Sequence, residues 1–261
     1  MNPNGANLPN ALPDIEERST PTGYFNLTRT ASYSFIASLP LFIAYEALIL
    51  WANAGNSVQV RISAEIWIKR MLAGFGIAGH IALGVLLLLI GFAILFSERK
   101  KQIPFHQRYF LIMIAESFFY AIVIGIIISR TVGMLFARIP AYPMISENGL
   151  FDLFTNISLS IGAGPYEELF FRVLLVGGLY LSIRLFIQNR ARAYTVSAII
   201  AALIFSGIHY IGIFGDPFIW SSFVFRFLFG LALNMIFLVR GFGVAAWTHA
   251  IYDILVVTEI I

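Results

Sequence analysis

The stretch GPYEELFFR, residues 164–172, places two adjacent carboxylates and an arginine at the start of an apolar run that continues to Ile187. Charges inside such a run are costly and are usually retained for a purpose. Pro165 suits the first position of a helix, because its missing N–H removes no intrahelical bond there. Glu167 and Glu168 would then lie in the first turn, where the helix dipole favours carboxylates. We therefore expect a membrane helix that begins at Pro165.

The three charges of this stretch divide into a pair and a single group. Glu168 and Arg172 are four residues apart with the acid first, which is the better order for a helical ion pair. Their spacing already explains them, so we expect a structural ion pair. Glu167 is turned by about 100° from Glu168 on a helix. It is therefore free for another role.

The composition identifies a membrane protein. Hydrophobic residues make up 59% of the 261 residues and charged residues only 12%, with a mean hydropathy of +0.83. Soluble domains carry roughly 25% charged residues. The formal net charge of +3 fits the basic loops of a membrane protein and requires no nucleic-acid partner. The chain has no cysteine, which excludes disulfides, thiolate metal ligands and cysteine nucleophiles.

Apolar runs of about 20 residues predict the membrane-spanning helices. We expect an all-α polytopic bundle of about seven spans, with six to eight compatible with the pattern. Charged and apolar residues alternate irregularly over 53–76, which indicates an interfacial helix. A separate helix is expected over 151–163, followed by a break at GAGP, residues 162–165. The seven expected spans are 31–52, 77–96, 109–129, 165–188, 194–214, 219–239 and 243–261.

The ends and loops of the chain predict its domains and its orientation. Residues 1–30 are rich in Asn, Pro and Thr, which is typical of a disordered tail, and 31–261 would form one membrane domain. The loops on the side of the N-terminus hold ten Lys and Arg residues, against five on the other side. The more basic side is normally cytoplasmic. We therefore expect a multi-pass protein of a bacterial cytoplasmic membrane, with a cytoplasmic N-terminus.

Two further spans repeat the format of ionisable groups inside apolar sequence. One ends with Phe205 and His209, and the last carries His249 and Asp253, which share one helical face at a spacing of four. Ionisable residues in spans are functional candidates by default. We interpret Glu167 with the two histidines as a converging polar site. Four other groups have structural interpretations as helix-packing or interfacial residues: Glu46, His80, Glu116 and Arg226.

Together these motifs resemble the signature of one family. EExxxR at 167–172, FxxxH at 205–209 and HxxxD at 249–253, each in an apolar span, are similar to the three motifs of the CPBP family. That family comprises the CAAX prenyl endopeptidases and the bacterial bacteriocin-processing or "abortive infection" proteins, which are intramembrane glutamic proteases. The resemblance covers about 165–256 and implies a catalytic core at about 150–261. Two departures are Val173, where many relatives have Gly, and Asp253, where the CAAX enzymes have Asn.

The resemblance also implies a mechanism without a cofactor. Glu167 and His209 would bind and activate a water, while His249 and Asp253 would face the carbonyl oxygen of the peptide bond. Glu168, Arg172 and Phe205 would support the catalytic residues. An ionised Asp253 would repel the oxyanion, so it is either protonated or orients His249 as the donor.

Three alternatives remain open on the sequence. Glu167, His209 and His249 have the ligand types of a catalytic zinc site, although the chain lacks a His-Glu-x-x-His motif. Buried carboxylates and histidines also mark proton relays in transporters and channels. A non-catalytic immunity or scaffold protein is the third alternative. For a protease we expect a membrane-associated protein or peptide as substrate, and the sequence leaves the oligomeric state open.

Overall fold

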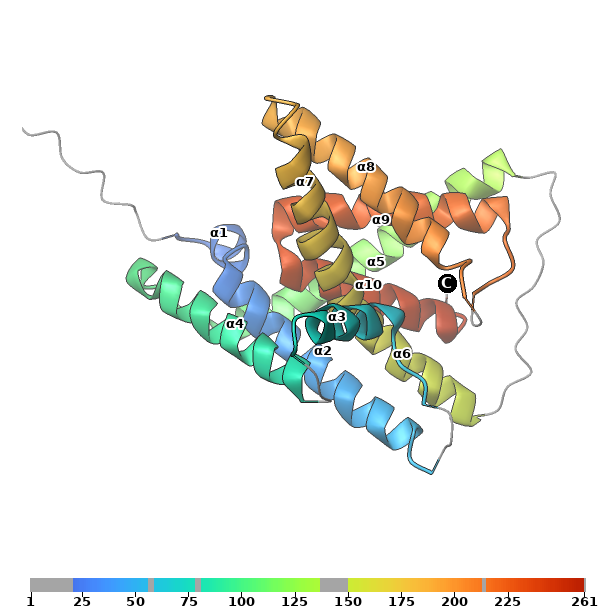
Figure 1. Cartoon of the computed structure of the whole chain (residues 1–261), viewed down its shortest axis with the longest axis horizontal. Coiled ribbons are helices and arrows are strands. Elements are labelled where there is room, and N and C mark those ends of the chain that lie inside the picture. The colour runs from blue at the N-terminus through green and yellow to red at the C-terminus, as the bar shows by residue number, and fades with distance from the viewer. Residues whose placement is uncertain (1–20, 56–58, 78–80, 137–149, 213–214, 261) are drawn as a thin grey trace, which may run out of the picture.

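The chain folds as an all-α bundle (Figure 1). The computed structural model describes residues 21–55, 59–77, 81–136, 150–212 and 215–260, and these residues contain helices and connecting turns but no strand. The elements in chain order are α1 Tyr24–Thr28, α2 Ala31–Ala52, α3 Ser63–Gly74, α4 Ala82–Glu98, the 3₁₀ turn η1 Arg99–Lys101, α5 Gln107–Leu135, α6 Leu150–Glu168, the π-helix η2 Leu169–Val176, α7 Gly177–Ile183, α8 Arg190–Ile208, α9 Trp220–Arg240 and α10 Phe242–Val257.

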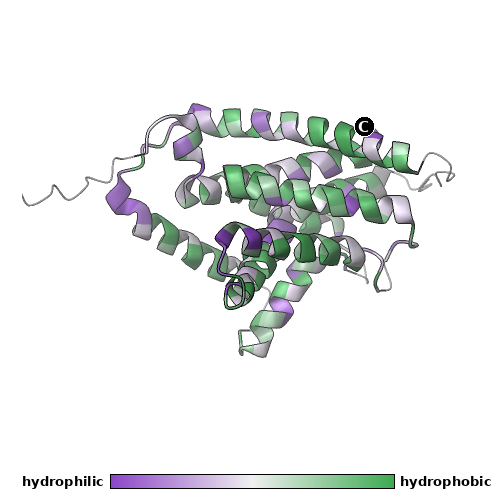
Figure 2. Cartoon of the chain, turned by 90° about the horizontal axis from the view of Figure 1, so that it is seen from above, coloured by the Kyte–Doolittle hydropathy of each residue, from purple (hydrophilic) through white to green (hydrophobic). Residues whose placement is uncertain are grey.

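Helix length and surface composition identify a multi-pass membrane protein. Within the described ranges, five helices are long and apolar enough to cross a membrane: α2, α4 with η1, α5, α8 and α9. The shorter apolar helix α10 and the rod formed by α6, η2 and α7 pack among them. Large apolar side chains such as Phe92 and Leu111 are about 70% exposed, as expected of surfaces that face lipid. Hydrophobic residues run along most helices and hydrophilic ones gather mainly at helix ends (Figure 2).

Most expected spans are confirmed, with shifted ends. The first coincides with α2, and α3 lies within the expected interfacial segment. Helix α5 extends to Leu135, six residues beyond the expected end of its span at residue 129. Residues 137–149 and His80 lie outside the described residues. The predicted disordered tail is too long: α1 lies within it, Leu27 and Thr28 are buried, and Tyr24 donates a 2.5 Å hydrogen bond to Glu116 of α5.

The expected break at 162–165 is wrong. Helix α6 continues through Pro165 and ends at Glu168, so the two glutamates lie in its last turn and not in a first turn. Gly162 and Gly164 do not interrupt the helix; they allow neighbouring helices to pack closely against α6. A Cβ on Gly164 would lie 2.3 Å from the Ala246 carbonyl oxygen of α10, and one on Gly162 would lie 2.3 Å from the Tyr45 ring of α2. Small residues permit such close approach between membrane helices.

The region after the glutamates is also irregular. The chain continues from Glu168 directly into η2, an eight-residue π-helix, and then into α7. Short π-helical segments inside α-helices are frequent at functional sites. Helix α10 lies in the centre of the bundle, where it contacts α2, α5, α6 and α9, and its contact with α6 is the most extensive in the described structure. This contact sets the last turn of α6 against the middle of α10.

Candidate active site

The expected site residues come together around one cavity. It has a volume of about 330 Å³ and lies where α6, α9, α10 and the end of α8 meet. We call it the catalytic cavity. Its lining includes Glu167 of α6, Phe205 and His209 at the end of α8, Arg226 of α9, and His249 and Asp253 of α10.

His249 is the most constrained of these side chains. It is only 2% exposed, and its Nδ1 lies 2.7 Å from Glu168 Oε1. An Nδ1–H donating to this carboxylate fixes the ring orientation, a tautomer assigned from the hydrogen-bond partner. The other nitrogen, Nε2, lies 3.5 Å from Asp253 Oδ2 and 3.9 Å from Glu167 Oε2. His249 therefore lies between three carboxylates, and Nε2 is the atom turned toward the cavity.

The expected ion pair of Glu168 and Arg172 is present. Arg172 Nη1 lies 2.9 Å from Glu168 Oε1, and both side chains are buried. The two groups are close without hydrogen-bond alignment, so the contact is chiefly electrostatic. Arg172 Nη2 donates to the carbonyl oxygen of Gly230 in α9 at 3.2 Å. Glu168 thus links the arginine to His249, a role that the sequence did not reveal because the spacing to Arg172 already explained the residue.

His209 has one ring nitrogen occupied and one available. Its Nδ1 lies 2.7 Å from the Phe205 carbonyl oxygen, so an Nδ1–H donor leaves Nε2 as an acceptor. The Phe205 ring packs edge-on against both His209 and His249, with centroid distances of 5.0 and 6.0 Å. The guanidinium of Arg172 lies 5.0 Å from the same ring centroid. Phe205 therefore holds the two histidines apart and supports both.

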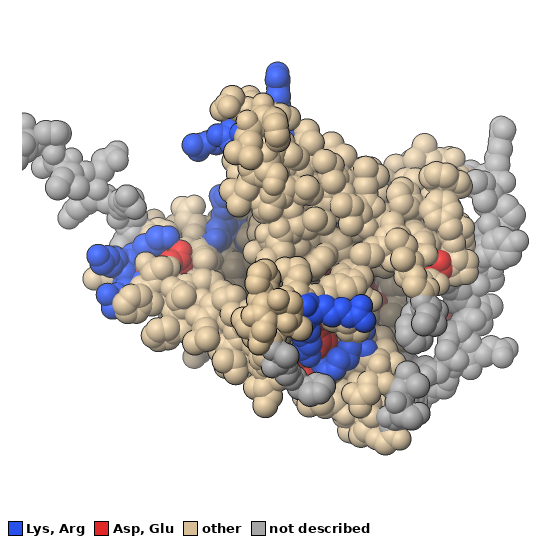
Figure 3. All heavy atoms as spheres, in the orientation of Figure 1, with Lys and Arg blue, Asp and Glu red and all other residues tan. Residues whose placement is uncertain are grey.

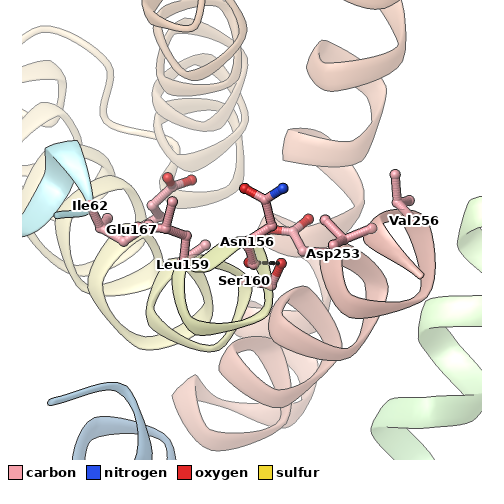
Figure 4. A pocket seen from close by; sticks show the side chains of 9 residues that line it. Ile62, Asn156, Leu159, Ser160, Glu167, Asp253 and Val256 are labelled. Atoms are coloured by element: carbon pink, nitrogen blue, oxygen red, sulfur yellow. Dashed lines mark hydrogen bonds between the residues drawn. The ribbon is translucent and has the colours of Figure 1, made fainter. Parts of the chain in front are cut away.

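Glu167 is the least restrained carboxylate of the group. Within the described chain it accepts no hydrogen bond, and its one ion-pair contact there is the 3.9 Å approach to His249. Its side chain is 15% exposed. It also borders a second cavity of about 260 Å³, which we call the side chamber (Figure 4). Asp253 and Val256 also line both cavities. The carboxylates of Glu167 and Asp253 therefore lie between the catalytic cavity and the side chamber.

The side chamber is lined by both polar and apolar groups. Asn156 and Ser160, one helical turn apart on α6, supply its uncharged polar side chains, and Ser160 Oγ donates to the Asn156 carbonyl oxygen at 2.9 Å (Figure 4). Ile62, just before α3, and Leu159 supply apolar surface. The side-chain amide of Asn156 and the hydroxyl of Ser160 lie beside apolar walls. Such a lining suits an extended peptide, whose backbone needs hydrogen bonds and whose side chains need space.

Arg226 is a site residue that sequence reasoning missed. It was interpreted as a helix-packing group, yet it lines the catalytic cavity. Its Nη2 lies 2.5 Å from Asp216 Oδ2, while Nη1 is buried without a partner among the described residues. The Asp216 backbone N–H donates to the His209 carbonyl oxygen at 2.9 Å. The available signal was a charge inside an apolar span, the same signal that singled out Glu167.

Two other carboxylates on the membrane helices have the structural roles expected of them. Glu116 of α5 pairs with Arg240 of α9 at 2.5 Å. Glu46 of α2 pairs with Arg61 at 3.2 Å and accepts a 3.2 Å hydrogen bond from Tyr166. These contacts join helices outside the catalytic cavity.

The side-chain positions bear on the zinc alternative. Among the described residues, no three His, Asp or Glu side chains are placed to hold one metal ion. The expected set Glu167, His209 and His249 therefore does not form a ligand group in this arrangement, and His249 already uses Nδ1 on Glu168. We derive no step through a metal.

Comparisons with known proteins bear on the same segment. Residues 149–255 match the family model described as type II CAAX prenyl endopeptidase Rce1-like. This range contains Glu167, His209, His249 and Asp253, together with Arg226. No curated protein and no solved structure matches the chain.

Proposed function

Because residues 149–255 match the family model of Rce1-like type II CAAX prenyl endopeptidases, we propose that this protein is an intramembrane glutamic endopeptidase. It hydrolyses a peptide bond of a membrane-associated protein or peptide, with a water activated by Glu167 and His209. The observation that carries this proposal is the convergence of Glu167, His209 and His249 from three helices on one cavity of a membrane bundle. Ionisable groups are retained at such depth chiefly for function.

Water activation is the first step. The Glu167 carboxylate has no competing hydrogen bond from the described residues, and His209 Nε2 is free of its backbone contact. A water held between them can give one proton to Glu167 while its oxygen attacks the peptide carbonyl carbon. General base catalysis of this kind contributes typically about 10²–10⁴-fold to a rate. Glu167 and His209 therefore act on the nucleophile.

Stabilisation of the oxyanion is the second requirement. Three carboxylates surround His249 and favour its imidazolium form, in which Nε2–H also donates. This N–H faces Asp253 and Glu167, so these two carboxylates compete for the donor. Arg226 Nη1 has no partner in the described structure and carries the positive charge that an oxyanion needs. We assign Arg226 and His249 to the developing oxyanion. Asp253 then orients His249 and balances the charge of the arginine.

Collapse of the tetrahedral intermediate completes the reaction. The carbon–nitrogen bond breaks, and the proton taken from water passes from Glu167 to the leaving amine. The products are one peptide with a new carboxylate and one with a new amine, so atoms and charge balance without an added reactant. Glu168 and Arg172 keep His249 in place throughout, as supporting partners do in other catalytic sites.

The two cavities suggest the path of the substrate. The catalytic cavity and the side chamber share Glu167 and Asp253, so a peptide that crosses these carboxylates extends into both. The catalytic cavity adjoins the end of α8 and the second half of α10. Together with the more basic loops on the N-terminal side, this arrangement supports a site nearer the non-cytoplasmic face of a bacterial cytoplasmic membrane. A secreted or membrane-anchored substrate fits that face.

Comparative proteomics of a Glu167→Ala strain against the wild type tests the function directly. An endopeptidase predicts at least one membrane-associated protein that remains uncut in the variant strain. A transporter, an immunity protein or a scaffold predicts the same termini in both strains. Retained cleavage by metal-free protein in the presence of a chelator distinguishes the proposed chemistry from the zinc alternative.

A further inference from the structure

A third cavity lies away from the catalytic residues. It has a volume of about 320 Å³, within the about 300–1,000 Å³ range of ligand pockets. Its walls come from α2, α4, η2 and the junction of α9 with α10. It shares no lining residue with the catalytic cavity or the side chamber. We call it the α2–α4 cavity.

The lining of this cavity has a polar end and an apolar body. Arg29 is its one charged lining residue and marks one end, while Phe42 of α2 and Leu87 of α4 mark the other. From Ala31 to Phe42 the helix rises by about 17 Å. This is roughly half of the ~30 Å hydrocarbon core of a bilayer. The cavity therefore has the length of one leaflet.

The polar end carries groups that lack partners. The exposed guanidinium of Arg29 has no ion pair or hydrogen bond among the described residues. The hydroxyl of Ser34 is also without a partner there, although the residue is only 5% exposed. A buried hydroxyl without a hydrogen bond is costly. A cation and a hydroxyl at the mouth of an apolar cavity fit a ligand with an anionic head, ester oxygens and a hydrocarbon tail.

The surroundings of the mouth are basic. The Ser32 N–H and hydroxyl both donate to Glu98 at the end of α4, at 2.9 and 2.7 Å. This contact brings the start of α2 beside η1, whose three residues are Arg99, Lys100 and Lys101. Figure 3 shows Lys and Arg side chains gathered at this end of α4. Basic clusters at the membrane surface attract anionic lipids.

We propose that the α2–α4 cavity binds one acyl chain of an anionic phospholipid, whose phosphate pairs with Arg29. The Ser34 hydroxyl donates to an oxygen of the glycerol esters, and the hydrocarbon tail lies along α2 toward Phe42. Leu169 and Val173 of η2 form part of the wall, so the tail packs against the π-helix that follows Glu167 and Glu168. The lipid is thereby a structural ligand of the domain and not its substrate.

Native mass spectrometry of the full-length protein in a neutral detergent tests this proposal. The probes are phosphatidylglycerol and phosphatidylcholine with identical acyl chains. One basic residue near a membrane surface is expected to favour the anionic lipid by about fivefold. Arg29→Gln should remove this preference, whereas Arg190→Gln, which changes an exposed arginine at the start of α8, should preserve it.

A second pair of variants tests the apolar part of the cavity. Val173→Trp places a larger side chain in the wall and should weaken retention of both lipids. Val239→Trp changes a comparably exposed valine outside the cavity and should leave retention unchanged. Size-exclusion profiles identify variants that fail to fold, and the readout does not depend on proteolysis.

Three results would overturn the assignment. They are equal retention of the two lipids by the wild type, equal loss in Arg29→Gln and Arg190→Gln, and displacement of phosphatidylglycerol by a farnesylated peptide. The last result would assign the cavity to a prenylated ligand.

Discussion

Among the single residues, we expect Glu168 to affect both the stability of the fold and the proposed catalysis. One oxygen of its carboxylate contacts both His249 and Arg172, at 2.7 and 2.9 Å. All three side chains are buried. Removing one member of a buried ion pair leaves the other uncompensated, which is far more costly than losing a surface pair. Glu168 is thus a positioning residue whose loss affects the fold and the site together.

We expect Glu168→Gln to lower the free energy of unfolding by about 3–5 kcal/mol, because the Arg172 charge stays buried without its counter-ion. Glu46→Gln is the matched control: its carboxylate is partly exposed, so its loss should cost about 1 kcal/mol or less. Unfolding in mixed micelles measures both. Equal stability of the two variants would contradict this role for Glu168.

Arg226 and Asp253 should respond in opposite ways to neutral substitution. Removal of one oxyanion donor typically lowers kcat by about 10²–10³-fold, so Arg226→Gln should lose activity on that scale, with Arg226→Lys between it and the wild type. Asp253→Asn should retain cleavage, because an amide can still orient His249 and does not repel an oxyanion. Steady-state kinetics on a substrate found by proteomics measure each effect.

A different pattern would reassign Arg226. If Arg226→Gln raises KM and leaves kcat unchanged, the arginine binds substrate without contacting the oxyanion. If Asp253→Asn is inactive, the aspartate takes part in proton transfer and the scheme is wrong at that step.

At the scale of elements, α3 is fastened to the bundle by a buried carboxylate. Glu65 is fully buried and accepts hydrogen bonds from Tyr45 at 2.6 Å, from Arg61 at 2.7 Å and from Lys69. Burial alone would lower the pKa of Arg61, but the carboxylates of Glu65 and Glu46 outweigh this effect and raise it. The anchored start of α3 holds Ile62 in the wall of the side chamber. The position of α3 therefore limits the space beside Glu167.

Because α6 packs closely on α10, we expect alanine substitutions at two glycines to have different effects on stability. Gly164→Ala should destabilise the protein by about 1–3 kcal/mol through overpacking, because the added methyl group meets the backbone of α10. It should also lower activity, since Glu167 lies one turn away. Gly178→Ala in α7 meets no atom within 4 Å and should be neutral or stabilising by up to about 1 kcal/mol.

Thermal unfolding and cleavage assays on the two alanine variants provide the measurement. If Gly164→Ala is as stable and active as Gly178→Ala, close approach of α6 and α10 does not set the site.

The elements also show how far sequence reasoning reaches. The spans α2, α5 and α9 follow from apolar length alone, and Glu167, His209 and His249 follow from charges placed inside such lengths. The continuous course of α6 through Pro165 could not be predicted, because glycine and proline are local breakers whose cost is offset only by packing against Tyr45 and α10. Contacts between residues far apart in sequence, such as Glu168 with His249, required the fold.

At the scale of the whole molecule, the basic side chains suggest its orientation. Lys and Arg side chains gather where α4 ends and at the turn between α7 and α8, with a further group over α3 (Figure 3). The catalytic cavity adjoins the end of α8, next to residues 209–212. The more basic face is expected in the cytoplasm. The cavity would then open toward the opposite face.

Single-cysteine variants test this orientation cleanly, since the chain has no native cysteine. We expect Phe218→Cys, in the exposed segment before α9, to react with a membrane-impermeant maleimide added outside intact cells. Lys100→Cys, in η1, should react only after permeabilisation. Labelling of Lys100→Cys alone in intact cells would reverse the orientation and place the cavity toward the cytoplasm.

The proposed role of Glu167 as the base depends on every level of the structure. Helix α6 sets its position, α8 and α10 supply its histidine partners, and the bundle surrounds the site. The most direct measurement is cleavage of a proteomically identified substrate by purified protein in proteoliposomes, with wild type, Glu167→Gln and Glu46→Gln compared at equal folded amounts. The mechanism predicts that Glu167→Gln abolishes cleavage while Glu46→Gln, outside both cavities, retains it. Full activity of Glu167→Gln would contradict the mechanism.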